Sequence, residues 1–229
     1  MLSNTPTTSK RQNSVAELVI VLGLAFGQFT LVSLQSFFYR AFQISGAEQP
    51  IVFTDELFIN LIGYEIVVGL LCCTILAARG WTLSDFHLRP TWKLTAMGFL
   101  LVAADYALYN ASTFLVGIVF GAQVLESVQF EYHVSLGVAA LLSIVNPLFE
   151  ELFVVGYAIP VVEGLSNVRV AIAFSTILRL VYHLYQGPMA FARILPMGLM
   201  FALVYCRWRK LWPLLVAHAA LDFLPLTFG

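Results

Sequence analysis

Seven long apolar runs constrain the fold of this chain more than any other feature. They lie at about 15–39, 57–78, 94–120, 134–160, 169–186, 189–206 and 211–227. A helix needs about 20 residues to cross the ~30 Å hydrocarbon core of a bilayer. Most of the runs reach that length, and the fifth and seventh are at its lower end. The sequence therefore predicts an all-α, polytopic membrane helix bundle of about seven transmembrane helices.

The composition agrees with a chain that lies in lipid. Of the 229 residues, 60% are hydrophobic and 11% are charged, whereas a soluble domain carries about a quarter charged residues. The net charge of −1 gives no reason to expect a nucleic-acid partner. We expect residues 14–229 to form a single transmembrane domain in the lipid bilayer. The polar residues 1–13 are expected to form a flexible cytoplasmic tail.

Basic residues recur at alternate ends of the predicted spans. Those before the first span and in every second connection are Lys10, Arg11, Arg79, Arg89, Lys93, Arg169, Arg207, Arg209 and Lys210. The opposite ends hold Arg40, Arg193 and the acids Glu48, Asp55, Glu126 and Glu131. Cytoplasmic loops of membrane proteins carry an excess of Lys and Arg. The N-terminus is therefore expected in the cytoplasm and the C-terminus outside.

Ionisable side chains inside the spans are costly and usually face a protein interior or a water-filled cavity. They are Glu65, Asp105, Glu150, Glu151, Arg179, His183, His218 and Asp222. At ~1.5 Å per residue, the last six lie roughly 12–21 Å from the cytoplasmic ends of their spans. Three helices can therefore bring these six side chains together if they are neighbours. Glu65 and Asp105 have no partner at helical spacing, and we expect them to be structural or to line a cavity.

The spacing of these residues suits acid–base chemistry. Arg179 and His183 are four apart, as are His218 and Asp222, so each pair shares a helical face. A carboxylate beside an imidazole can take a proton from water, and a second imidazole can stabilise an oxyanion. Glu150 with the two histidines could instead hold zinc and keep an open position. The pattern leaves both mechanisms open, although it contains no HExxH motif.

Three short motifs, in order on three hydrophobic helices, resemble those of the CPBP family of intramembrane proteases, also called the CAAX protease and bacteriocin-processing family. That family carries EExxxR, then FxxxH, then HxxxN or HxxxD. Here the motifs begin at Glu150, Arg179 and His218. Val155 stands where the family has arginine, and Arg179 stands where it has phenylalanine. We interpret this as a cation that has moved to a neighbouring helix, where it still pairs with Glu151.

The resemblance implies an intramembrane endopeptidase whose motif-bearing core lies at about 134–227. It implies that Glu150 and His183 activate water and that Glu151 supports the site. His218 and Asp222 would form the oxyanion side, with Asp222 either protonated or acting to orient His218. No cofactor is favoured, and zinc on the Glu/His/His set stays possible. The expected substrate is a membrane protein or peptide that is lipidated or carries a leader. We expect a multi-pass protein of a bacterial plasma (inner) membrane.

Two other functions fit parts of the pattern. The departures from the motifs would suit a catalytically inactive scaffold or regulator on the same fold. A small proton-coupled transporter could use Glu65, Asp105 and the paired glutamates as a proton relay. Substitution of Glu65 is expected to separate these readings, since a transporter would lose its function and a protease would keep it.

Overall fold

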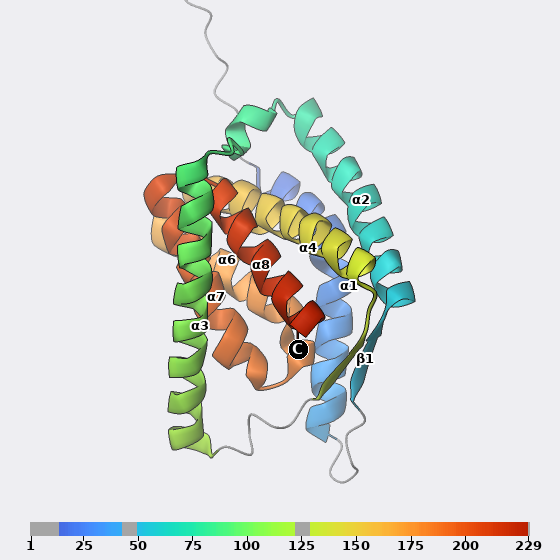
Figure 1. Cartoon of the computed structure of the whole chain (residues 1–229). Coiled ribbons are helices and arrows are strands. Elements are labelled where there is room, and N and C mark those ends of the chain that lie inside the picture. Colours follow the sequence, from blue (N-terminus) through green and yellow to red (C-terminus); the bar gives the residue numbers. More distant parts are fainter. Residues whose placement is uncertain (1–13, 43–49, 122–128, 229) are drawn as a thin grey trace, which may run out of the picture.

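The computed structural model describes residues 14–42, 50–121 and 129–228. The tail predicted at 1–13 lies outside them. In chain order the elements are α1 (Val15–Phe42), β1 (Ile51–Thr54), α2 (Asp55–Ala78), η1 (Leu83–Phe86), α3 (Trp92–Phe120), β2 (Phe130–His133), α4 (Leu136–Glu150), η3 (Glu151–Tyr157), α5 (Ala158–Leu165), α6 (Val168–Tyr182), η4 (Leu184–Gln186), α7 (Met189–Trp208) and α8 (Trp212–Phe228). The fold is an all-α helical bundle, as predicted (Figure 1).

The helices differ in how well their length fits a bilayer. In the described part of the chain, those long and apolar enough to cross a membrane are Val15–Tyr39, Asp55–Ala78, Trp92–Phe120, Leu136–Leu165 and Met189–Trp208. The α8 helix has 17 residues and α6 has 15, which rise only ~26 Å and ~22 Å. The fifth predicted span, 169–186, ends as a helix at Tyr182. The expected number of seven spans is therefore approximate.

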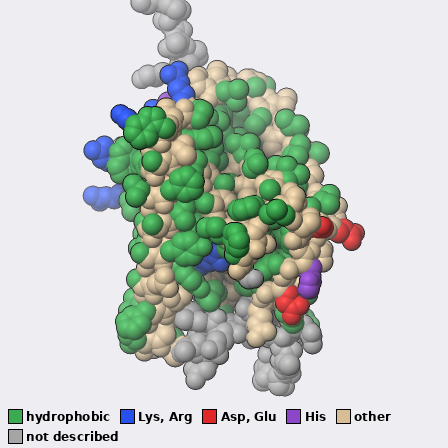
Figure 2. Space-filling model, in the orientation of Figure 1, with side chains coloured by type: hydrophobic (Ala, Val, Ile, Leu, Met, Phe, Trp, Pro, Cys, Tyr) green, Lys and Arg blue, Asp and Glu red, His purple; other side chains and the backbone are tan. Residues whose placement is uncertain are grey.

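The surface has the character of a protein that lies in lipid. On the outer faces of α2 and α3, large apolar side chains such as Val67, Leu100 and Phe114 are strongly exposed. Figure 2 shows hydrophobic side chains over most of one face, with most basic ones gathered at the upper left. The acidic side chains that this view shows lie at the right and lower right. This separation agrees with the charge alternation along the sequence. The long apolar helices indicate an integral membrane protein.

The α8 helix sits between α3 and α4 and packs closely against α3 (Figure 1). A Cβ atom at Gly98 of α3 would lie 2.6 Å from the Val216 Cβ and 2.9 Å from the Pro213 carbonyl oxygen. Only glycine allows the two backbones to approach this closely. This contact holds α8, and with it His218, in the middle of the bundle.

The α4 helix continues without a break through η3 into α5. The η3 segment is a seven-residue π-helix and all its residues are buried. Stretches of π-helix are rare, and they often lie at functional sites. Glu150 is the last residue of α4 and Glu151 is the first of η3. The paired glutamates therefore straddle a change in helical geometry that the sequence did not predict.

A small parallel sheet was also not predicted. β1 pairs with β2 in the register Ile51↔Phe130 to Thr54↔His133. β1 leads directly into α2, and β2 comes just before α4. The Asp55 Oδ1 accepts a hydrogen bond from the Ser135 backbone N at 2.7 Å, which ties the starts of these two helices together. The sheet lies at the end of α2 and α4 that is remote from η1 (Figure 1).

Candidate active site

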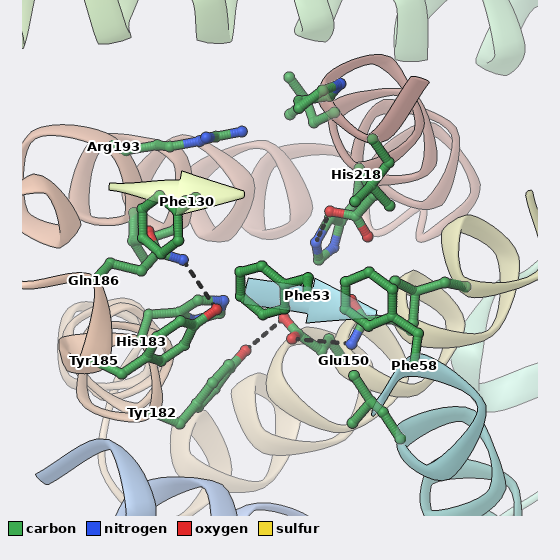
Figure 3. Close-up of a pocket in the computed structure, with 18 of the residues that line it drawn as sticks. Phe53, Phe58, Phe130, Glu150, Tyr182, His183, Tyr185, Gln186, Arg193 and His218 are labelled. Atoms are coloured by element: carbon green, nitrogen blue, oxygen red, sulfur yellow. Dashed lines mark hydrogen bonds and ion pairs between the residues drawn. The ribbon is translucent and has the colours of Figure 1, made fainter. Parts of the chain in front are cut away.

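A cavity of about 220 Å³ lies between the sheet and helices α2, α4, α7 and α8 (Figure 3). The ionisable side chains that line it are Glu65, Asp105, Glu150, Tyr132, Tyr182, His183, Tyr185, Arg193, His218 and Asp222. The structure thus brings together four of the residues that the sequence placed at one depth: Glu150, His183, His218 and Asp222. Glu151 and Arg179 do not line the cavity, but they contact residues that do.

Glu150 is buried and held mainly by one of its two oxygens. Its Oε2 accepts hydrogen bonds from the Tyr182 hydroxyl at 2.7 Å and from Arg179 Nη1 at 3.1 Å. Its Oε1 has only a long contact, 3.4 Å, with Asn146 Nδ2. Neither Tyr182 nor Asn146 was predicted. Asn146 lies four residues before Glu150, so helical spacing could have revealed it. Tyr182 lies on another helix and gave no such signal.

Glu151 is fully buried and holds two partners on one oxygen. Its Oε1 accepts from Arg179 Nη2 at 2.6 Å and from His218 Nδ1 at 2.7 Å. Arg179 pairs with both glutamates, which is the contact that the hypothesis of a cation on a neighbouring helix requires. Val155, at the arginine position of the motif, is an apolar side chain buried in η3. A shared cation offsets the repulsion between two adjacent buried carboxylates.

His183 follows the last residue of α6. Its Nδ1 lies 2.9 Å from the backbone carbonyl oxygen of Arg179. A carbonyl oxygen can only accept, so Nδ1 carries the proton in this contact. In the neutral ring, Nε2 then has a free lone pair. His183 is half-buried and lines the cavity. The backbone contact therefore sets the tautomer that a general base requires.

His218 is oriented by Glu151 more closely than by Asp222. The His218 Nε2 lies 3.6 Å from Asp222 Oδ1, too far for a hydrogen bond, whereas Nδ1 bonds to Glu151 at 2.7 Å. The other oxygen of Asp222, Oδ2, is buried and has no hydrogen-bond partner in the described part of the chain. Of the two roles considered for Asp222, orienting His218 is thus filled mainly by Glu151.

Glu65 lines the cavity, as one of its two expected roles required. It is 2% exposed. Its Oε1 accepts a hydrogen bond from Asn146 Nδ2 at 2.6 Å, and the same nitrogen lies near Glu150. Asp105 also lines the cavity. Because Glu65 is linked to Glu150 through Asn146, its substitution no longer separates a transporter from a protease.

The zinc alternative receives no support from the arrangement of side chains. Within the described ranges, no group of three or more His, Cys, Asp and Glu residues could hold a metal ion. Glu150, His183 and His218 line one cavity without forming such a group.

Comparison with known proteins agrees with the motifs. A family model described as Rce1-like, type II CAAX prenyl endopeptidase, matches residues 132–224. The matched segment runs from β2 into α8 and contains all three motifs. No curated protein and no solved structure gives a match. The match confirms the resemblance inferred from the sequence, and it supports an intramembrane endopeptidase of the CAAX type in general.

Proposed function

We propose, on the premise that residues 132–224 belong to this family of CAAX-type proteases, that the chain hydrolyses a peptide bond of a membrane-associated substrate. The observation that carries the proposal is the convergence of Glu150, His183 and His218, from three helices, on one cavity. A carboxylate and two imidazoles supply a proton acceptor and a donor for a developing charge.

We assign the activation of water to Glu150 and His183. The Glu150 Oε1 and the His183 Nε2 each have a lone pair that a water molecule can reach from the cavity. Either Glu150 or His183 takes a proton from the water molecule, and the water oxygen attacks the substrate carbonyl carbon. Tyr182 and Arg179 hold the other oxygen of Glu150 and fix the direction of the carboxylate. The proton is then passed to the amine that leaves when the C–N bond breaks.

We assign the stabilisation of the oxyanion to His218 and Asp222. Glu151 accepts a hydrogen bond from His218 Nδ1, which directs Nε2 toward Asp222 and stabilises a doubly protonated ring. An ionised Asp222 would repel an oxyanion. We therefore assign it a protonated carboxyl, which donates a hydrogen bond beside that of Nε2.

The substrate is a membrane protein or peptide, with a lipidated C-terminus or a leader. The name of the matching family adds prenylated CAAX proteins to the candidates. The setting is a bacterial inner membrane, with the N-terminus in the cytoplasm. Transport has no comparable support. The departures at Val155 and Arg179 do not favour an inactive scaffold, since Arg179 restores the missing cation.

A peptidase assay on the purified protein in lipid nanodiscs tests the proposal. The substrates are farnesylated CAAX peptides and membrane-anchored leader peptides, each with and without a chelator. We expect cleavage of at least one class, unaffected by chelator and lost in Glu150→Gln. A folded protein that cleaves nothing in either class would point to a scaffold. Loss with chelator and recovery with zinc would point to a metal mechanism.

A further inference from the structure

The two-stranded sheet has backbone groups that no residue of the described chain uses. The Ile51 N donates to the Gln129 carbonyl oxygen at 2.9 Å. In a parallel ladder, alternate residues of each strand bond to the neighbouring strand. With Ile51 opposite Phe130, the groups of Phe130 and Tyr132 point away from β1. Among the described residues, the N–H and C=O groups of these two residues have no backbone partner along the outer edge of β2.

This edge belongs to a wall of the cavity. The side chains of Phe53, Phe130 and Tyr132 line the cavity together with Glu150 and His183. The Phe53 ring stacks on Tyr132 with centroids 5.4 Å apart and on Phe130 at 5.9 Å. Figure 3 shows Phe53 and Phe130 on the two strands, with Arg193 on the side of β2 away from β1 and Gln186 beside Tyr185 and His183. Arg193 and Gln186 also line the cavity. The outer edge of β2 thus borders the candidate active site.

A helical substrate segment is poorly suited to hydrolysis, because its carbonyl groups are engaged within the helix. Once unwound near lipid, its backbone needs new hydrogen-bond partners. An exposed strand edge supplies them to an extended peptide, and alternate side chains of that peptide then face the same way. On β2 those that face the cavity would meet the aromatic rings of Phe53 and Phe130. Apolar side chains fit there.

We infer that the substrate binds as a third strand on the outer edge of β2, extended through the cleavage site and with every second side chain on the aromatic wall. This rests on the proposed function, since it concerns the substrate of the same site. It names the bound conformation and the backbone groups that hold it. Tyr132 and Phe130 are binding residues through their main chain, in addition to their side chains.

Proline provides the main test, because it removes one N–H. The probe is a farnesylated CAAX peptide that the wild-type protein cleaves, or the leader peptide if only that is cleaved. Tyr132→Pro is expected to raise KM roughly tenfold relative to Tyr132→Ala, which loses the same ring but keeps the N–H. Val52→Pro removes an outward N–H from the other edge and is the matched control. Equal KM for the proline and alanine variants of Tyr132, or a rise only in Val52→Pro, would overturn the inference.

N-methylation of the probe gives a second test that needs no protein variant. Methyl groups placed one residue at a time should raise KM at alternate positions, since only every second N–H of a strand faces its neighbour. In the Glu150→Gln protein, bound peptide should also slow hydrogen exchange in the segment 129–134 and not in 50–55. If methylation raised KM equally at all positions and hydrogen exchange were unchanged, the third-strand model would be wrong. The proposed protease activity would not be contradicted. Absence of both cleavage and binding would instead count against the proposed function.

Discussion

Two buried glutamates with arginine partners lie in different surroundings. Glu17 of α1 accepts hydrogen bonds at Oε2 from Arg79 Nε, at 2.8 Å, and at Oε1 from the Tyr157 hydroxyl, at 3.2 Å, with Trp81 Nε1 at 3.4 Å from Oε1. Both of its oxygens are occupied. It does not line the cavity described above. Glu17 ties α1 to the end of α2 and to η3.

Glu150 is as buried as Glu17 but less completely bonded. Arg179 and Tyr182 share one of its oxygens, and the other has only the 3.4 Å contact with Asn146. That oxygen belongs to a cavity-lining residue. Burial and an ion pair therefore do not distinguish the proposed catalytic acid, Glu150, from Glu17. The difference lies in an oxygen that remains available to a ligand.

The largest expected effect separates these two acids. Glu150→Gln keeps the size and the hydrogen bonds but removes the proton acceptor, so kcat should fall by ~10²–10⁴. Glu17→Gln is the matched change and should leave kcat unchanged. Peptidase assays and thermal unfolding of both variants measure this. Equal losses of activity in the two variants would mean that Glu150 and Glu17 do not differ in role. Full activity in Glu150→Gln would rule out Glu150 as the base.

The two arginines should differ in stability. Arg179 is 1% exposed and contacts two buried carboxylates, so Arg179→Met should cost about 3–5 kcal/mol, as for other broken buried pairs. The Arg79 side chain is 52% exposed, and Arg79→Met should cost about 1 kcal/mol or less. The unfolding midpoints of the two variants measure this difference in stability. Adding Glu151→Gln to Arg179→Met should recover part of the loss, and no recovery would contradict uncompensated charge as its cause.

Two substitutions of Asp222 test its proposed role as a hydrogen-bond donor to the oxyanion. Asp222→Asn should retain activity, because an amide can still donate to the oxyanion. Asp222→Leu should lose ~10²–10³-fold in kcat, the usual cost of removing such a donor. Metal analysis of the wild-type protein completes this test. Loss of activity in Asp222→Asn together with one equivalent of bound zinc would contradict the protonated acid. It would indicate instead a metal site in which Asp222 orients His218.

The smallest expected effect compares two tyrosines. Tyr182→Phe removes the 2.7 Å hydrogen bond to Glu150 and should lower kcat about tenfold. Tyr157→Phe removes the 3.2 Å bond to Glu17 and should change only the unfolding midpoint. Steady-state kinetics and melting curves distinguish the two. A kcat loss of similar size in Tyr157→Phe would mean that the Glu17 cluster also acts on the site.

The bundle and the meeting of polar residues could be predicted because both follow from local rules. Apolar length locates helices, and rise per residue gives the depth of a side chain. The pairing of Arg179 with Glu151 was also predictable, because Val155 left the motif without its cation. The end of α6 at Tyr182 was missed, since the limits of an apolar run locate a helix end only to within about 2–4 residues.

The features that were missed depend on contacts between distant parts of the chain. β1 and β2 are short segments whose pairing joins residues 51–54 to 130–133, and neither strand has a strong pattern of its own. The link from Glu65 to Asn146 joins α2 to α4 and has no signature in spacing. The π-helical geometry of η3 arises within an apolar run, where α and π turns have the same composition.

The η3 segment also has a consequence for insertions and deletions. It begins at Glu151, which holds His218, and ends at Tyr157, which bonds to Glu17. A π-helical bulge amounts to one extra residue in an α-helix, and each residue of an α-helix turns the chain by ~100°. Loss of one residue between them would rotate one end against the other by about that angle. The length of η3 therefore fixes where the contacts of Glu151 with Arg179 and His218 lie relative to the contact of Tyr157 with Glu17.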